Sequence, residues 1–304
     1  MKPKVDFLND ERLEMLYNHK QFKAIHKFLS IPKNLPRLSN DTKQELFFRT
    51  AIDGLNDMMK LLMTDTSVNP AARDDFEKRL SKKHLYSPNI LLIIEVVRED
   101  NDDNDAICYA AANGHYECVV TLWNDEKVKR GYTTVDALRN AAYFGHADIL
   151  LFLLSDPTLD PSSADNYAIQ NAAANGHLDC VKLLMADKRV NPSANQSNPL
   201  RIAAQIGHAQ VVEYLLKDKR VDPAAVDNSA ICLAAELGHT DCVKVLLKDT
   251  RVDPTIDNNY PLRIAFVKGH PEAVIVLKNN PKVMKSLSGR KLDISKTKSK
   301  YFSS

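Results

Sequence analysis

The chain has 304 residues and a hydrophobic share of 44%, which is enough to build a buried interior and excludes disorder throughout. Its 41 Lys and Arg against 39 Asp and Glu give a formal net charge of +2, which argues against a dedicated nucleic-acid or membrane-surface binder whose whole fold is basic. No apolar run is long enough for a membrane span or a signal peptide. We therefore expect a cytoplasmic protein, with the nucleus as the alternative, whose five cysteines are thiols.

The first 45 residues are predicted to form capping helices. Apolar side chains recur at helical spacing between Asp10 and Leu29, for example at Leu13, Leu16 and Ile25. Helices at the end of a stack of repeated units are expected to keep a polar outer face. Residues 1–45 are therefore interpreted as such an end.

Residues 46–102 contain two imperfect copies of a helix-turn-helix pattern that becomes regular after residue 103. In the first copy, Gly54 is followed by apolar residues at helical spacing and by a segment that ends at Pro70. The second copy, around Lys83-His84, keeps the spacing but lacks the glycine, and Pro88 falls inside its expected second helix. We predict diverged repeats over this stretch.

Residues 103–283 contain six regular copies with a period of 31 residues. Each copy has an apolar residue seven positions before a Gly-His pair, then a small pair that is usually Ala-Ala, and a second apolar set at helical spacing after the pair. A segment such as Asp218–Pro223, in which proline stops the helix, leads to the next copy. The pattern predicts an all-α fold of stacked helix-turn-helix units. The pairs are Gly114-His115, Gly145-His146, Gly176-His177, Gly207-His208, Gly238-His239 and Gly269-His270.

The glycine and histidine of each pair are predicted to have structural roles. The glycine supplies a positive φ in a tight turn between helices, where a β-carbon should cost about 1–2 kcal/mol. Packed helices lie roughly 8–10 Å apart, whereas Zn–N bonds measure about 2.0–2.1 Å, so equivalent histidines cannot share a metal ion. The same spacing keeps Cys118, Cys180 and Cys242 too far apart for disulfides, and we predict that they are core thiols.

The last segment, residues 284–304, is predicted to be a flexible basic tail. From Pro281 to Ser304, seven Lys and Arg accompany a single Asp, for a net charge of +6. Such charge runs are usually solvated, so we favour a role in keeping the last unit soluble. Weak contact with nucleic acid or acidic lipid is the alternative.

The repeated pattern resembles the ankyrin repeat. Asn198-Pro-Leu-Arg201 and Tyr260-Pro-Leu-Arg263 look like the Thr-Pro-Leu-His opening of that family, and Gly-His followed by Val-x-x-Leu-Leu matches it residue for residue. The chain departs from the family in its 31-residue period, against the usual length of about 33. It also has Arg-Val-Asp-Pro where the family has Gly-Ala-Asp-Val-Asn. It is similar to a shorter variant in expanded ankyrin families of amoebae and large DNA viruses, and the deletion leaves the geometry of the loop tips open.

The resemblance implies that partners meet the loop tips and the exposed positions of each first helix. The positions before the glycine vary between copies, and large aromatic and arginine side chains stand where the family has Thr or His; such residues are favoured as interface anchors. In the alternative, Arg201 and Arg263 bond neighbouring loop carbonyls and Tyr143 packs on the next unit. The candidate contacts are Arg139, Tyr143, Phe144, Tyr167, Gln170, Arg201, Leu237, Tyr260 and Arg263. The variable pairs before the glycine are Tyr143-Phe144, Gln205-Ile206, Glu236-Leu237 and Val267-Lys268.

No catalytic or cofactor motif stands out in the sequence. It contains no Cys-x-x-Cys, no His-Glu-x-x-His and no Gly-rich phosphate loop. The acidic run Glu99–Asp105 lacks the glycine and terminal glutamate of an EF-hand loop. We expect no cofactor, no metal and no enzymatic activity. A converging pocket near Lys83-His84, where the repeat breaks, would favour an enzyme instead.

The repeats predict a function as well as a fold. A 31-residue unit cannot bury its own apolar face, so the units must stack into an elongated spine. We predict a non-catalytic scaffold that binds partner proteins through the concave face and loop tips. The alternative is the targeting arm of a ubiquitin-ligase-type adaptor that docks through residues 1–45.

Overall fold

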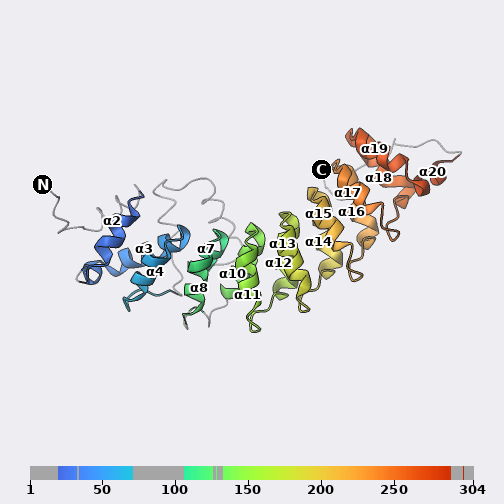
Figure 1. Cartoon of the computed structure of the whole chain (residues 1–304). Coiled ribbons are helices and arrows are strands. Elements are labelled where there is room, and N and C mark those ends of the chain that lie inside the picture. Colours follow the sequence, from blue (N-terminus) through green and yellow to red (C-terminus); the bar gives the residue numbers. More distant parts are fainter. Residues whose placement is uncertain are drawn as a thin grey trace. The chain divides into compact units, whose positions relative to one another are not determined.

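The computed structural model describes residues 20–32, 34–70, 106–125, 128, 133–288 and 297. Every regular element in this part of the chain is a helix, as Figure 1 shows. The chain divides into two compact units, Met1–Ala141 and Ala142–Ser304. Across the described ranges, no helix has both the length and the apolar character needed to cross a membrane.

The first unit contains pairs of helices packed in register. Helix α3 packs on α7, and α4 packs on α8, while α2 contacts α4. The helix α3 begins after Ser39, whose hydroxyl accepts a hydrogen bond from the backbone N–H of Thr42 at 3.1 Å. The elements of this unit are α2 (Phe22–Leu29), η1 (Leu35–Arg37), α3 (Asn40–Ile52), α4 (Asn56–Met63), α7 (Ala106–Ala112), α8 (Tyr116–Trp123) and the greater part of α10 (Thr133–Phe144).

The helix pair at Gly54 is the direct neighbour of the pair at Gly114. The imidazole of His115 lies on Gly54, and its Nε2 donates to the carbonyl of Ile52 at 2.7 Å. In the second unit, a glycine and the histidine that lies on it come from consecutive copies of the 31-residue pattern. Gly54 and His115 come from copies that are roughly two periods apart. The copy predicted around Lys83-His84 and the acidic run Glu99–Asp105 lie outside the described residues.

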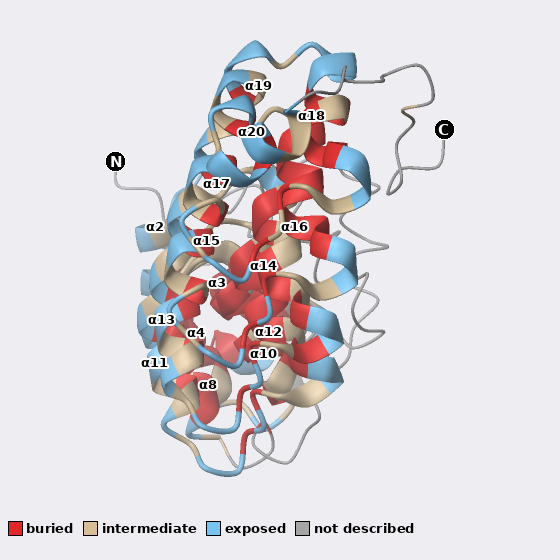
Figure 2. Ribbon diagram, turned by 90° about the vertical axis from the view of Figure 1, so that its right-hand side faces the viewer, coloured by how far each residue is buried: buried red, intermediate tan, exposed pale blue. Residues whose placement is uncertain are grey.

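The second unit is a two-layered stack of helix pairs. The first helices of its pairs, α12, α14, α16 and α18, pack on one another in order, and so do the second helices α11, α13, α15, α17 and α19. Figure 2 shows buried residues concentrated along the row of first helices. The helices are α11 (Ala147–Leu154), α12 (Ser163–Ala174), α13 (Leu178–Ala186), α14 (Ala194–Ile206), α15 (Ala209–Leu215), α16 (Ala225–Glu236), α17 (Thr240–Leu246), α18 (Ile256–Lys268), α19 (Pro271–Lys278) and α20 (Pro281–Leu287).

The residues that recur in each copy form the core between the two layers. The alanine pairs Ala203-Ala204 and Ala234-Ala235 are fully buried, because small side chains let neighbouring first helices approach closely. All five cysteines are buried, and none of them forms a disulfide. Burial raises the pKa of the thiols of Cys118, Cys180 and Cys242 to about 11, so they stay protonated at neutral pH.

In the second unit, each of the first helices α12, α14, α16 and α18 opens with a left-handed turn that lies inside the bounds given above. Three consecutive residues in each adopt positive φ, and the third closes the turn; Asn228 N–H, for example, donates to the carbonyl of Ala224 at 2.9 Å. Eight of these twelve residues are Asn or Asp, which tolerate the left-handed region better than most side chains. This is the geometry of the loop tips that the sequence left open. The turns are Ala164–Asn166, Asn195–Ser197, Val226–Asn228 and Asp257–Asn259.

The helix α20 changes the predicted boundary of the basic tail. Residues 284–287, which the sequence assigned to the tail, belong to this helix. The side chain of Asn280 caps its first turn, and Val283 is fully buried, so burial and capping extend the ordered chain beyond the sixth copy. Of the residues after Ser288, the structure describes Thr297.

Candidate functional site

The glycine of each Gly-His pair has positive φ, and in most copies of the repeat it is subject to a second constraint. Gly176 and Gly238 have φ of 75° and 76°. A β-carbon on either residue would lie 2.5 Å from Nδ1 of a histidine in the following unit, His208 or His270. Glycine is therefore required both by the backbone conformation and by the imidazole that rests on it.

Each of these histidines joins its own helix pair to the helix pair before it. Nε2 of His177 donates to the carbonyl of Tyr143, and Nε2 of His208 donates to that of Ala174, each at 2.9 Å. Burial lowers the pKa of His177 below its usual 6.5, against the opposing effect of the bond to Tyr143, and so favours the neutral ring. In the described ranges, no three His, Cys, Asp or Glu side chains gather in a way that could hold a metal ion.

The connectors are tied together by arginines whose role the sequence analysis did not identify. Arg251 Nη2 donates to the carboxylate of Asp249 at 2.7 Å, and its Nη1 donates to the carbonyl of Val221 in the previous connector at 2.8 Å. Arg220 repeats this arrangement one unit earlier, with Asp218. The recurrence of Asp-x-Arg in three consecutive copies is the sequence signal that could have revealed it.

Two of the predicted contact arginines are committed to the left-handed turns. Arg201 donates to the carbonyls of Asn195 and Gln196 at 3.0 and 3.1 Å, and Arg263 donates to that of Asp257 at 3.0 Å. These are the loop-carbonyl bonds of the alternative stated above. The guanidinium groups of both arginines therefore stabilise the turns from which the first helices start. These bonds limit the freedom of the two side chains to bind a partner.

Two other predicted contacts are buried. Tyr260 is 2% exposed and Gln170 is 8% exposed, and the amide of Gln170 donates to the carbonyl of Asp165 at 2.7 Å. Burial keeps both side chains from anchoring a partner while the repeats are folded. In the first unit, Arg139 is half-buried and pairs with Asp136 on its own helix.

The remaining predicted contacts are partly accessible. Tyr143, Phe144 and Tyr167 are half-buried, and the rings of Tyr143 and Phe144 meet edge to face with centroids 4.8 Å apart. Leu237 is exposed. These four side chains are the predicted contacts that a partner can reach most readily.

An apolar row lies at the C-terminal ends of two consecutive first helices. We define it as Ile206 of α14 and Leu237, the residue that follows α16, which occupy the same position of consecutive copies and are both exposed. Phe266 and Val267 of α18 are exposed as well, at other positions of their copy. Phe266 was not predicted as a contact, although it replaces the second alanine of the recurring pair, which was the available signal. Beside Leu237, the buried Glu236 forms an ion pair with Lys268, with Nζ and Oε1 3.5 Å apart.

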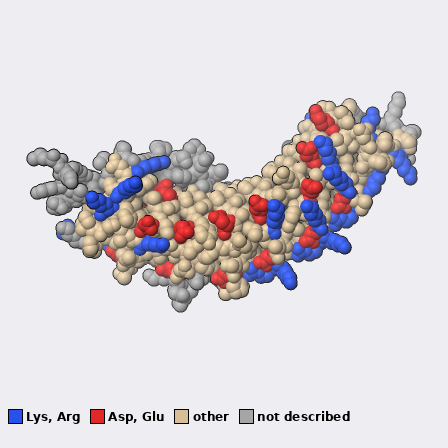
Figure 3. Space-filling model, in the orientation of Figure 1, with Lys and Arg blue, Asp and Glu red and all other residues tan. Residues whose placement is uncertain are grey.

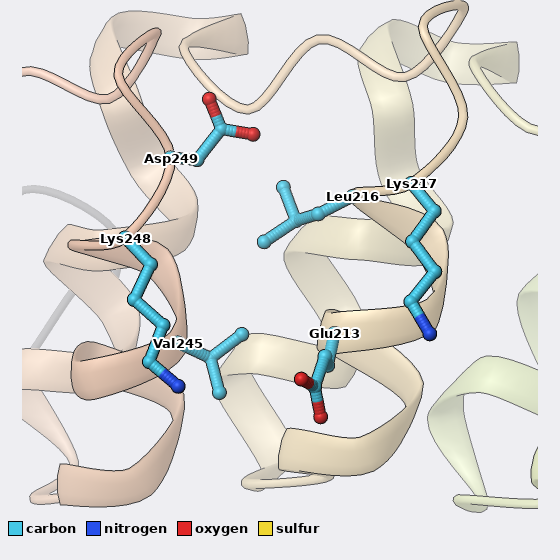
Figure 4. A pocket seen from close by; sticks show the side chains of 6 residues that line it. All are labelled: Glu213, Leu216, Lys217, Val245, Lys248 and Asp249. Carbon is cyan, nitrogen blue, oxygen red and sulfur yellow. The ribbon is translucent and has the colours of Figure 1, made fainter.

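A shallow groove lies between the second helices α15 and α17. Its volume is about 250 Å³. Figure 4 shows Leu216 and Val245 directed into the space between the helices, and Lys217 and Lys248 at its sides. Asp249, which also lines the groove, is bonded to Arg251 of the same connector.

Comparison with known families identifies the repeats in the central part of the chain. A model of three ankyrin repeats matches residues 138–227, and a model of the single ankyrin repeat matches residues 227–259. No curated protein matches the chain significantly. The matched residues contain the helix pairs, the Gly-His turns and the arginine-linked connectors described above. Residues 138–259 are thus ankyrin repeats, and the predicted all-α solenoid of stacked helix-turn-helix units is confirmed.

Proposed function

We propose that the protein is a non-catalytic scaffold that binds partner proteins through the apolar row and the neighbouring positions of the first helices. Ankyrin repeats are protein-interaction modules, and this supports a scaffold in general terms. One observation supports the particular surface. Ile206 and Leu237 occupy the same position of consecutive units and are 46% and 40% exposed. Large apolar side chains gathered on a surface are typical of contact sites.

The charge distribution supports a contact surface defined by shape and apolar side chains. Figure 3 shows acidic and basic side chains interspersed over the visible face of the second unit, without a large field of one sign. Many of the charges are also paired within connectors, as Arg251 is with Asp249. Specificity would then come from the side chains that vary between units, with Leu237, Tyr143, Phe144 and Tyr167 as the proposed contacts. We propose further that these repeats are the shorter 31-residue variant of expanded ankyrin families.

The experiment compares two apolar surfaces of the same unit. The test protein carries Ile206→Ser and Leu237→Ser, and the control carries Leu151→Ser, whose side chain on the second helix α11 is 57% exposed. Crosslinking mass spectrometry in lysate should show partners lost from the test protein and retained by the control. Thermal unfolding should be similar for both, because exposed substitutions usually change stability by less than about 0.5 kcal/mol. The proposal fails if the test protein keeps every partner of the wild type.

The adaptor alternative has less support in the structure. Ile25, Phe28 and Leu29 of α2 are buried, so the apolar face of this helix is used inside the first unit, as expected of a cap. Recovery of ubiquitin-ligase core subunits with the full chain, lost on deletion of residues 1–45, would favour the adaptor instead.

A further inference from the structure

The position of Ile206 and Leu237 is occupied by a lysine in the next copy. The residue before the glycine is Ile206, then Leu237, then Lys268 in three consecutive copies. Lys268 is the last residue of α18, and its side chain is 46% exposed. In the copy before Ile206 the position belongs to Asn175, whose amide donates to the carbonyl of Asn171 in α12 at 3.0 Å. The apolar row is therefore followed, toward the C-terminus, by a cation.

A buried carboxylate sets the position of this cation. The side chain of Glu236, the residue before Leu237, is fully buried, and neither of its carboxylate oxygens has a hydrogen-bond partner among the described residues. Oε1 of Glu236 lies 3.5 Å from Nζ of Lys268. A buried charge without a counter-ion is costly, so the ammonium group is expected to stay at this carboxylate. It is thereby held close to Leu237, at the end of the row.

The ammonium group of Lys268 keeps the capacity to bind a second carboxylate. It has three N–H donors, and Glu236 contacts it from the buried side, while nearly half of the lysine side chain is open to solvent. A carboxylate that arrives from solvent meets this positive charge first, whereas a basic side chain is repelled by it. The charge at this end of the row therefore favours an acidic partner.

The three equivalent positions are spaced for a short segment of chain. Packed helices lie roughly 8–10 Å apart, so three such positions in consecutive copies span about 16–20 Å. Extended chain rises about 3.3 Å per residue, so about six residues cover this distance. One segment can thus place apolar side chains on Ile206 and Leu237 and a carboxylate on Lys268 at the same time.

We propose that Lys268 is the acid-binding position of the apolar row, and that the row takes a partner segment with two apolar side chains and an Asp or Glu on one side of them. This inference rests on the proposed function, because it assigns the chemistry of the partner at the same surface. The apolar contacts bind the segment and the lysine selects it, since like charges that meet across an interface exclude wrong partners.

Peptide selection tests the surface and its charge preference separately. A phage-displayed library of random peptides is selected on the wild-type protein, and peptides that also bind the Ile206→Ser/Leu237→Ser variant are removed. We expect the remaining peptides to carry two apolar residues with Asp or Glu on one side. Remaining peptides without this acidic residue, or with a basic one in its place, would overturn the acid-binding position and leave the proposed function standing. If no peptide remains, both are overturned.

Affinity measurements assign the preference to Lys268. Lys268→Met alone would leave the buried carboxylate of Glu236 without a cation, so the comparison is between Glu236→Gln and Glu236→Gln/Lys268→Met. In calorimetric titration, a selected peptide should bind the double variant about fivefold more weakly than the single variant, because an ion pair is lost. The same peptide with its acid replaced by the amide should bind both variants equally.

Two further variants control for structure and for charge elsewhere. Lys268→Arg keeps the charge and should bind the acidic peptide like the wild type. Lys244→Met removes a comparably exposed lysine of α17, which pairs with Asp241 at 2.8 Å, and should also bind like the wild type. Equal binding of the acidic peptide by Glu236→Gln and Glu236→Gln/Lys268→Met would refute the role of Lys268.

Discussion

At the residue scale, the second unit depends on a small set of bonds repeated from one helix pair to the next. The glycine of one pair makes room for the histidine of the following pair, and that histidine satisfies a carbonyl near the C-terminal end of the preceding first helix. A buried backbone carbonyl without a partner would cost about 1–3 kcal/mol. Each Gly-His turn is therefore part of an interface between neighbours as well as a link within its own pair.

Two glycine substitutions separate the backbone effect from the packing effect. Gly238 and Gly269 have nearly the same φ, 76° and 78°, but only Gly238 lies under a histidine ring. Gly269→Ala should lower the free energy of unfolding by the left-handed penalty alone, about 1–2 kcal/mol. Gly238→Ala should lower it further, because the β-carbon displaces His270. Urea unfolding followed by circular dichroism measures both, and equal losses would contradict a role for the imidazole.

At the element scale, the connector takes part in the contacts between neighbouring repeats, as the helices do. Its left-handed turn sets the start of the first helix, and the third residue of the turn reaches the next connector; Asn228 Oδ1 accepts the backbone N–H of Asp253 at 2.7 Å. The arginine of that connector bonds back to the preceding one. Connector and helix pair therefore fold together, as expected of units that are not stable alone.

The connector carboxylates should make stability depend on pH in acid. Hydrogen bonds from Arg220 and Arg251 lower the pKa of Asp218 and Asp249 below 3.8. The unfolded chain then binds more protons than the native state, so the stabilisation is present above the unfolded pKa and is lost as the pH falls through the native pKa. Urea midpoints should fall below about pH 4. The Arg220→Gln/Arg251→Gln variant should show a shallower fall, and an unchanged slope would contradict this assignment.

The same argument applies to His177 in a higher pH range. Its pKa is lowered, so the native state favours the neutral ring and its contribution is complete above the unfolded pKa of about 6.5. Stability should therefore decline as the pH falls below that value, before the carboxylates titrate. A His177→Gln variant, followed by the same urea series, should lose this shoulder and keep the acid transition; retention of the shoulder would assign it to another group.

At the scale of the whole molecule, stability in each unit comes from contacts between neighbours in the stack. Leu184 of α13 has a neighbouring helix pair on both sides, whereas Leu277 of α19 is in the last regular pair. Both side chains are fully buried. The same truncation at the two positions should therefore destabilise different numbers of neighbouring helix pairs.

Two leucine truncations test how far the destabilisation spreads to neighbouring helix pairs. Leu184→Ala should cost about 2–5 kcal/mol and speed amide exchange in the helix pairs on both sides of α13. Leu277→Ala should speed exchange in α18, α19 and α20 and leave α12 to α15 protected as in the wild type. Hydrogen exchange read by mass spectrometry distinguishes them. Uniform loss of protection from both variants would mean that the second unit unfolds as one block.

Much of this organisation could be predicted from the sequence, because it depends on local patterns. The 31-residue period predicted the helix pairs, and the Gly-His pairs predicted turns with positive φ. Both predictions were possible because backbone conformation and helical spacing depend on residues within one copy. The candidate contacts were harder to predict. Leu237 is exposed, whereas Tyr260 and Gln170 are buried in the folded stack, and the sequence of a single copy does not reveal this.

The sequence by itself determined the helices, their turns and the apolar faces that must meet, because each follows from residues a few positions apart. Only the tertiary structure decided which side chain of one unit rests on which backbone of the next. The imidazole of His208 on Gly176 and the arginine bonds between connectors join residues about thirty positions apart. It also made the Gly54 pair the neighbour of the Gly114 pair, through His115. Such long-range partners are decided by the packing of whole helix pairs, which leaves as few buried polar groups as possible without a hydrogen bond. No local sequence pattern specifies that packing.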